Sequence, residues 1–172
     1  GKTGTALSFN GTSQYVNVPF HSSLDFTGDT VSLMAWINAT VTTGRYGNIV
    51  VLPSNESTWT EKYNLQLNYD NLYFIVDTGT ESAMVFSFTT TGSWVHVAGV
   101  YNGTDMRLYI NGSLVGTPVS KTGNLRSRVD GDLCIGRYGP TQGLYFVGMI
   151  DDVRVYSRAV TADEVSQVYG LG

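Results

Sequence analysis

The fold is decided by Gly148-Met149-Ile150-Asp151-Asp152-Val153-Arg154-Val155-Tyr156, which is followed by Ser157-Arg158-Ala159-Val160-Thr161-Ala162-Asp163-Glu164-Val165. Apolar and polar residues alternate in the first part, a pattern that predicts a β-strand with one buried face. Thr161 and Glu164 then have the spacing of a capping box, in which both side chains bond free backbone amides at a helix start. We therefore expect a short helix from Thr161 to Gly170, covering one end of the domain.

Strand-like segments recur along the rest of the chain, separated by Asn-Gly, Thr-Gly and Asp-Asn steps that are typical of hairpin turns. The expected strands or strand pairs are 5–19, 30–40, 48–53, 63–69, 72–77, 83–88, 94–101, 106–110, 114–119, 133–136 and 144–156. No linker divides them, so residues 1–172 are interpreted as a single domain. Many short strands at this spacing predict an all-β sandwich or barrel.

Four blocks of sequence carry a family resemblance. They are 6–16 (Ala-Leu-Ser-Phe-Asn-Gly-Thr-Ser-Gln-Tyr-Val), 31–36 (Val-Ser-Leu-Met-Ala-Trp), 92–112 with its Trp-Val-His-Val-Ala strand, and the C-terminal stretch quoted above. In this order they resemble the laminin-G-like, concanavalin A-like jelly-roll modules. The resemblance implies an antiparallel two-sheet jelly roll with one short C-terminal helix. It also implies a module that binds or adheres rather than catalyses.

Composition excludes several classes of partner. The net charge is −4 and no Lys/Arg cluster is present, which argues against nucleic acid. No run of eighteen apolar residues occurs, so membrane insertion is not expected. Cys134 is the only cysteine and lies in an apolar run, as a buried thiol would. Five Asn-x-Ser/Thr sequons favour a secreted or cell-surface protein; they begin at Asn10, Asn38, Asn55, Asn102 and Asn111.

The sequence contains no recognisable catalytic pattern. Glucanases of this fold place a Glu-x-Asp-x-x-Glu run on one strand, and no such run occurs here. The glutamates are scattered along the chain, at Glu56, Glu61, Glu81 and Glu164. Two distant histidines and one cysteine lack transition-metal spacing, and His96 is expected to be a hydrogen-bonded structural imidazole. We predict that the chain is not an enzyme.

A calcium ion is predicted beside Asp151. Strict alternation would place this carboxylate on the same face as Val153 and Val155, where it is costly unless paired or bound to a metal. The related glucanases are similar here, with an Asp before the Val-Arg-Val-Tyr strand that serves a structural calcium. Oxygens of Asn10 and Asp29 could complete the site. The alternative is that Asp151 caps backbone amides or pairs with an arginine.

Aromatic residues in polar or glycine-rich loops are the candidates for ligand binding. Tyr46, Trp59 and Tyr138 lie in such surroundings, and flat rings beside amide and hydroxyl groups pack on sugars. Trp36 and Trp94 lie in strand patterns and are instead expected between the sheets.

The sequence therefore predicts a non-catalytic extracellular binding module with a structural calcium ion. A glycan or cell-surface polysaccharide is the first choice of ligand, because the candidate residues are loop aromatics. The alternative is a protein-interaction or structural domain of an adhesin or filament, with no glycan ligand. This fold carries many functions, so the resemblance alone does not decide between the two.

Overall fold

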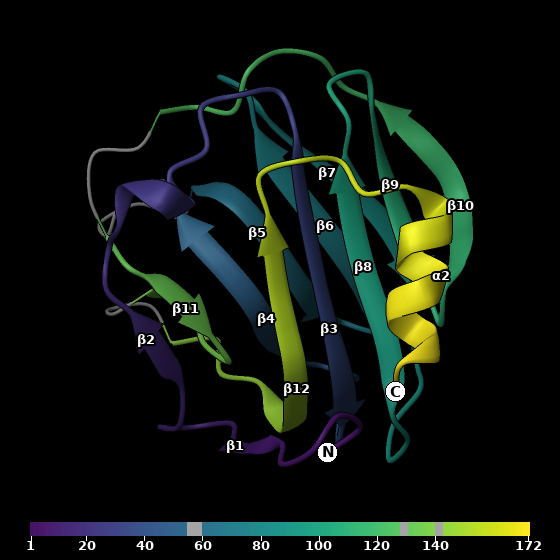
Figure 1. Cartoon of the computed structure of the whole chain (residues 1–172). Coiled ribbons are helices and arrows are strands. Elements are labelled where there is room, and N and C mark those ends of the chain that lie inside the picture. The colour runs from purple at the N-terminus through teal and green to yellow at the C-terminus, as the bar shows by residue number, and fades with distance from the viewer. Residues whose placement is uncertain (55–59, 128–130, 140–142) are drawn as a thin grey trace.

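The computed structural model describes residues 1–54, 60–127, 131–139 and 143–172. Within these residues the strands form two antiparallel six-stranded sheets (Figure 1). Sheet A consists, in order, of β1 (Leu7–Asn10), β12 (Val147–Tyr156), β3 (Val31–Ala39), β8 (Val95–Tyr101), β9 (Asp105–Ile110) and β10 (Ser113–Ser120). Sheet B consists of β2 (Val16–Val18), β11 (Leu133–Ile135), β4 (Tyr46–Pro53), β5 (Glu61–Asn68), β6 (Asn71–Asp77) and β7 (Glu81–Ser87). The predicted two-sheet sandwich is confirmed.

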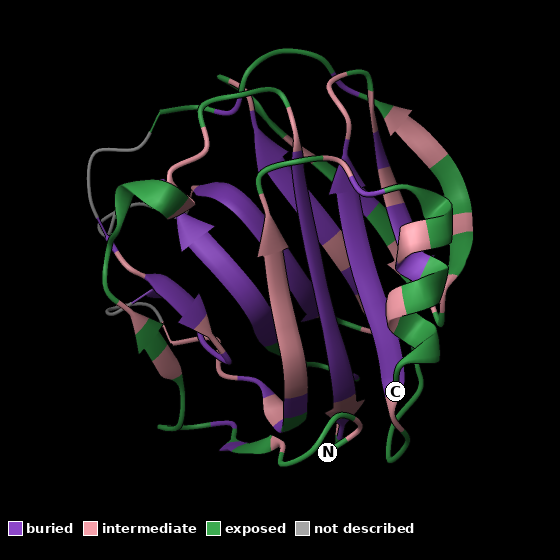
Figure 2. Cartoon of the chain, in the orientation of Figure 1, coloured by how far each residue is buried: buried purple, intermediate pink, exposed green. Residues whose placement is uncertain are grey.

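The core lies between the two sheets and follows the period of two expected of strands. On β3, Leu33 and Ile37 point into it and are fully buried. On sheet B, Leu65 of β5 and Phe74 of β6 are opposite each other in the ladder and belong to the same cluster. Figure 2 shows the buried residues concentrated on the central strands of both sheets. This packing fixes the sandwich, and the loops at its ends are left free to carry other functions.

A glycine allows the two sheets to approach closely. A Cβ atom added at Gly99 of β8 would lie 2.3 Å from Cδ2 of Phe74, on the opposite sheet. That distance is well inside a van der Waals contact, so the aromatic ring occupies the volume that any other side chain would need. Gly99 is therefore required by packing.

Helix α2 (Ala162–Gly170) begins with the predicted capping box. Thr161 accepts a hydrogen bond from the backbone of Glu164 at 3.2 Å, and Glu164 accepts one from the backbone of Thr161 at 2.8 Å. The helix lies on the outer face of sheet A, where Val165 packs with Met34 and Tyr109. The expectation that it covers an end of the sandwich is thus wrong. In the described residues no helix is long and apolar enough to cross a membrane.

A bulge in β12 corrects the predicted orientation of Asp151. The pairing with β3 shifts register between Asp151 and Arg154, so that one extra residue is inserted. Asp152 has a left-handed backbone with φ of 48°, which accommodates the insertion. Ile150, Val153 and Val155 all contact the core, whereas Asp151 pairs with Trp36 on the opposite face. Strict alternation of inward and outward side chains fails here, because the extra residue exchanges the two faces for the side chains on either side of the bulge.

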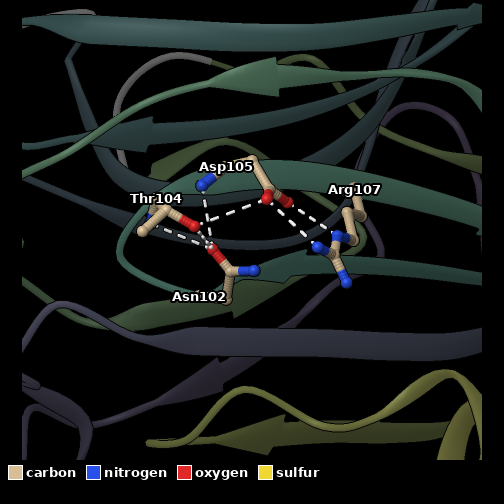
Figure 3. Close-up of polar contacts among 4 residues, drawn as sticks. All are labelled: Asn102, Thr104, Asp105 and Arg107. Carbon is tan, nitrogen blue, oxygen red and sulfur yellow. Dashed lines mark hydrogen bonds and ion pairs between the residues drawn. The ribbon is translucent and has the colours of Figure 1, made fainter.

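The turn between β8 and β9 shows how a sequon doubles as a turn signal (Figure 3). The side-chain oxygen of Asn102 accepts hydrogen bonds from the backbone amides of Thr104 and Asp105, at 3.0 and 2.8 Å. Asp105 in turn binds the guanidinium of Arg107 at 2.6 Å. Such an Asx turn satisfies its own polar groups. These contacts stabilise the turn between β8 and β9.

The outer face of sheet A holds a buried aromatic cluster. Trp36 is 2% exposed and its ring centroid lies 5.4 Å from that of His96 and 5.5 Å from that of Tyr169. It therefore packs outside the sheets rather than between them, and Trp94, just before β8, is only half-buried. Among the described residues neither ring nitrogen of His96 has a hydrogen-bond partner, so the expected hydrogen-bonded imidazole is wrong. Burial lowers the pKa of His96 to about 4, against the opposing charge of Asp152.

Candidate functional site

Four tyrosines, from separate loops, gather at the end of the sandwich where β12 begins, the lower end in Figure 1. Tyr15 precedes β2, Tyr46 begins β4, Tyr69 lies in the turn between β5 and β6, and Tyr145 precedes β12. We call this group the tyrosine end. Antiparallel pairing brings the loops together, because β4, β6 and β12 start where β1, β3 and β5 finish.

Two rings of the tyrosine end, those of Tyr46 and Tyr145, line a hollow of about 270 Å³. Tyr46 and Tyr69 meet edge to face with centroids 5.1 Å apart, and the centroids of Tyr15 and Tyr145 are 6.4 Å apart. Tyr15, Tyr46 and Tyr69 are 42%, 39% and 53% exposed, which is high for aromatic residues. The hollow is lined by Gly11, Gly44, Arg45, Tyr46, Leu144 and Tyr145. Tyr46 thus occupies the exposed position expected of it, and its role in binding stays a prediction.

Hydrogen bonds hold the loops of the tyrosine end in place. Asp70 accepts hydrogen bonds from the hydroxyls of Thr42 and Thr43, at 2.6 and 2.9 Å. The backbone amide of Tyr69 also donates to the carbonyl of Arg45 at 3.0 Å. Tyr69 and Asp70 both have left-handed backbones, with φ of 46° and 63°. This strained turn persists because the neighbouring loop fixes it, so the rings are presented by an ordered scaffold.

Two arginines bring positive charge to the same end. Arg45 donates from Nη2 to the carbonyl of Gly11 at 3.1 Å, and no described carboxylate forms an ion pair with it. Arg137 is 5% exposed, and its guanidinium carbon lies 3.6 Å from the ring centroid of Tyr15 and 6.0 Å from that of Tyr145. Such contacts are cation–π interactions. Rings beside guanidinium donors can pack on sugar C–H faces and bond hydroxyls.

The other two predicted ligand-binding aromatics do not join this surface. Tyr138 is 1% exposed and packs with Val51 and Cys134 against sheet B. The expectation of an exposed ring in a loop is wrong for Tyr138, because the segment after β11 folds back onto the sheet. Trp59 lies outside the described residues. No local pattern predicts that Tyr15, Tyr69 and Tyr145 meet Tyr46, since they come together only through the strand register.

The predicted calcium ligands are not brought together by the fold. Asn10 pairs with Val147 near the end of β3, whereas Asp29 precedes the start of β3. The nine residues of β3 separate them by roughly 25 Å. Asp151 lies between these positions and accepts hydrogen bonds from the backbone amides of Lys2, Thr3 and Asp152, at 2.7, 3.0 and 2.9 Å. These contacts are the amide capping weighed as the alternative.

Asn10 is also engaged locally, because its side-chain oxygen accepts hydrogen bonds from the amides of Thr12 and Ser13 at 3.0 and 2.9 Å. In the described residues no three His, Cys, Asp or Glu side chains form a group that could hold a metal ion. Asn10, Asp29 and Asp151 therefore do not fit a common calcium site. Calcium binding itself stays a prediction.

Two glutamates that appear scattered in the sequence meet at the opposite end of sheet B. Glu61 begins β5 and Glu81 begins β7, and the backbone amide of Glu61 donates to Oε1 of Glu81 at 2.7 Å. Burial, together with the hydrogen bond and charge of Glu81, raises the pKa of Glu61 to about 8. The Thr-Gly turn before Glu81 could have predicted this meeting. It reverses the chain between β6 and β7, so that Glu61 and Glu81 lie at the same edge of an antiparallel meander.

A larger hollow, of about 540 Å³, lies between helix α2 and sheet A. Its charged residues are already paired, since Arg158 binds Glu164 through two contacts of 2.8 and 2.7 Å. Of the described residues that line it, Tyr156 alone is aromatic, and most of the uncharged ones are aliphatic. The tyrosine end offers more aromatic surface and more unpaired donors, so it is the better candidate for a polar ligand.

Comparison with known proteins gives a family and a set of structural neighbours. A family model described as the concanavalin A-like lectin/glucanases superfamily matches residues 10–166. Among curated proteins there is no match.

Among solved structures, domain 4 of an extracellular arabinanase from Geobacillus stearothermophilus, in complex with arabinotriose, has a TM-score of 0.74 at 19% identity. The match covers 98% of this chain and 78% of that domain. The receptor-binding domain of botulinum neurotoxin mosaic serotype C/D has a TM-score of 0.73 at 16% identity, covering 96% of this chain and 41% of that one. The serotype G binding domain has a TM-score of 0.69 at 15% identity, covering 96% and 46%. The chain thus spans less than half of the neurotoxin chains, and these identities support the fold alone.

Proposed function

The chain belongs to the concanavalin A-like lectin/glucanases superfamily, and we propose that it is a non-catalytic carbohydrate-binding module of a secreted or cell-surface protein. The observation that carries the proposal is the tyrosine end. The rings of Tyr46 and Tyr145 line one hollow, and the rings of Tyr69 and Tyr15 pack against them. The guanidinium of Arg45 also lines the hollow, without an ion-pair partner among the described residues.

Carbohydrate fits this surface better than an apolar ligand does. Exposed aromatic rings are unfavourable in water unless something covers them, and sugar rings present apolar C–H faces of matching size. Arg45 retains N–H donors beyond the one used by Gly11, and these could bond sugar hydroxyls. The ordered turn at Tyr69 and Asp70 reduces the entropy lost when a ligand binds.

The arrangement of carboxylates supports a module without hydrolase activity. Glu61 and Glu81 lie close together, since the backbone amide of Glu61 donates to Oε1 of Glu81 at 2.7 Å. A retaining glycosidase needs its two carboxyl groups about 5 Å apart, with the sugar between them. Glu61 is buried against Glu81, which leaves no room for a glycosidic bond between them. This pair therefore does not supply an acid and a nucleophile in working positions.

Exposed sequons support an extracellular location. Asn10 and Asn111 are exposed on the surface of the sandwich and could accept glycans. A likeness to an extracellular arabinanase domain bound to arabinotriose agrees with both the location and the ligand class. The alternative is a module that contacts protein in an adhesin or filament, and the likeness to neurotoxin receptor-binding domains is compatible with it.

A glycan array separates the two functions. The purified chain is applied to immobilised oligosaccharides that include linear arabinan fragments, with the variant Tyr46→Ala/Tyr145→Ala as the control for the surface. Binding by the wild type that the double variant loses supports carbohydrate recognition at the tyrosine end. An array without signal, together with self-association or capture of one specific protein, would contradict it and support the alternative.

A further inference from the structure

A buried lysine connects the start of β5 to the segment before β3. Lys62 is fully buried, and its Nζ is in direct contact with Oδ1 of Asp25, the residue that follows the short 3₁₀ helix η1 (Ser22–Leu24). The side chain of Asp25 is only 15% exposed. A buried ion pair gains little stability, because the cost of taking both charges out of water offsets their attraction. Ion pairing alone is therefore a weak reason for burying this lysine.

The residues on either side of Asp25 fix its position against β5. The carbonyl of Leu24 accepts a hydrogen bond from the hydroxyl of Tyr63, the neighbour of Lys62, at 2.9 Å. The ring of Phe26 stacks on the ring of Tyr63, with centroids 5.8 Å apart and planes 18° apart. Leu24 and Phe26 both pack against the core between the sheets. Contacts on both chains thus hold the amine of Lys62 against the carboxylate, as an intramolecular reaction requires.

This pair differs in its chemistry from the other ion pairs of the described residues. Their cations are arginines that are all more exposed than Lys62, namely Arg107, Arg126, Arg154 and Arg158. A guanidinium does not lose its proton in proteins, whereas a lysine amine can do so when burial disfavours its charge. The neutral amine is a nucleophile toward carbonyl carbon. Among these ion-paired cations, Lys62 is the one that could react with its partner.

We propose that Lys62 and Asp25 become joined by an intramolecular isopeptide bond. The ammonium of Lys62 first passes a proton to the carboxylate, which gives a neutral amine and a carboxylic acid. Nζ then attacks Cγ of Asp25, the nitrogen loses a proton, and the departing hydroxyl gains one. An amide between Nζ and Cγ forms and one water molecule leaves. Nζ contacts Oδ1, which is bonded to Cγ, so the reacting atoms lie within the roughly 3–3.5 Å of a near-attack arrangement.

The reaction removes two charges from a buried position and needs no oxidant or other reactant. Well-oriented intramolecular groups act at effective concentrations of about 10⁵–10⁸ M, which favours an amide that would not form between separate molecules in dilute water. The bond would close a loop between positions 37 residues apart and restrict the unfolded chain, as a disulfide does. Cys134 is the only cysteine, so residues 1–172 contain no internal disulfide. The crosslink is independent of the proposed carbohydrate binding.

Intact-mass spectrometry of the purified chain tests the bond. The wild type should be lighter than its sequence by the mass of one water molecule, whereas Lys62→Met and Asp25→Ala should each have the full mass of their sequences. Lys121→Met is the matched control, because Lys121 is also buried but donates to the carbonyl of Thr80 at 2.7 Å rather than to a carboxylate. This variant should keep the water loss.

A tryptic digest of the wild type locates the bond and needs no variant that might fail to fold. It should contain a branched peptide that joins Asp25 to Lys62, with no cleavage after Lys62. A wild type that has its full sequence mass, and whose digest contains peptides ending at Lys62, would overturn the proposal. So would a water loss that both Lys62→Met and Asp25→Ala retain, because the loss would then lie at another residue.

Discussion

Replacing His96 with phenylalanine should remove a large part of the protein's sensitivity to acid. His96 is 1% exposed between Trp36 and Tyr169, and burial lowers its pKa from 6.5 to about 4. In the unfolded chain the imidazole takes up a proton near its ordinary pKa, whereas the folded protein resists protonation. The contribution of His96 is therefore fully present above pH 6.5 and is lost as the pH falls toward 4.

The magnitude follows from the difference between the two pKa values. Each pH unit corresponds to about 1.4 kcal/mol, so the free energy of unfolding should fall by about 3 kcal/mol between pH 6.5 and 4 through this residue alone. For a domain of this size the loss corresponds to a drop in Tm of roughly 10 °C. Phenylalanine keeps an aromatic ring in the cluster and has no proton to take up.

Urea unfolding at pH 7, 6, 5 and 4 measures the effect. The wild type and His96→Phe will both lose stability from other acid-sensitive contacts, so the informative quantity is the difference between their slopes. His21→Phe serves as the matched control, because His21 is exposed and should leave the slope as it is in the wild type. If His96→Phe and the wild type lose stability in parallel, the buried neutral imidazole is refuted.

Two further stability predictions follow from buried groups. Burial and Glu81 raise the pKa of Glu61 to about 8, so its contribution to the free energy of unfolding is present below pH 4.5 and is lost as the pH rises through 8. In EDTA, the free energy of unfolding of the wild type, measured with urea, should therefore fall between pH 5 and 9, and that of Glu61→Gln should fall less. Equal slopes for the two proteins would contradict the buried pair. Gly99→Ala should cost about 1–3 kcal/mol in the same assay, because its Cβ would lie 2.3 Å from the ring of Phe74, whereas Gly28→Ala, with open space around it, should cost little. A neutral Gly99→Ala would mean that the sheets can move apart freely.

Local patterns in the sequence predict most of the strands and the helix, because these depend on neighbours in the chain. The capping box of Thr161 and Glu164 is a spacing of three residues, and it is present as predicted. The face of Asp151 could not be predicted in the same way. A single left-handed residue, Asp152, inserts a bulge, and nothing in an alternating strand pattern marks that position.

The candidate site is less predictable than the fold, because it depends on which loops meet. Tyr46 was expected in an exposed loop and is exposed, at the first residue of β4, whereas Tyr138 has similar glycine-rich surroundings and is buried. The difference arises from the segment after β11, which folds back so that Tyr138 covers Val51 and Cys134. Glu61 and Glu81 are likewise joined only by the register of β5, β6 and β7.

The central claim is that the tyrosine end binds carbohydrate, and isothermal titration of the best oligosaccharide from the array tests it most directly. Removing either ring from the hollow deletes stacking surface, so Tyr46→Ala and Tyr145→Ala should each weaken binding at least about tenfold. Both variants should keep a cooperative unfolding transition, and Tyr169→Ala on helix α2 should bind as the wild type does. Unchanged affinity in both Tyr46→Ala and Tyr145→Ala would contradict the account.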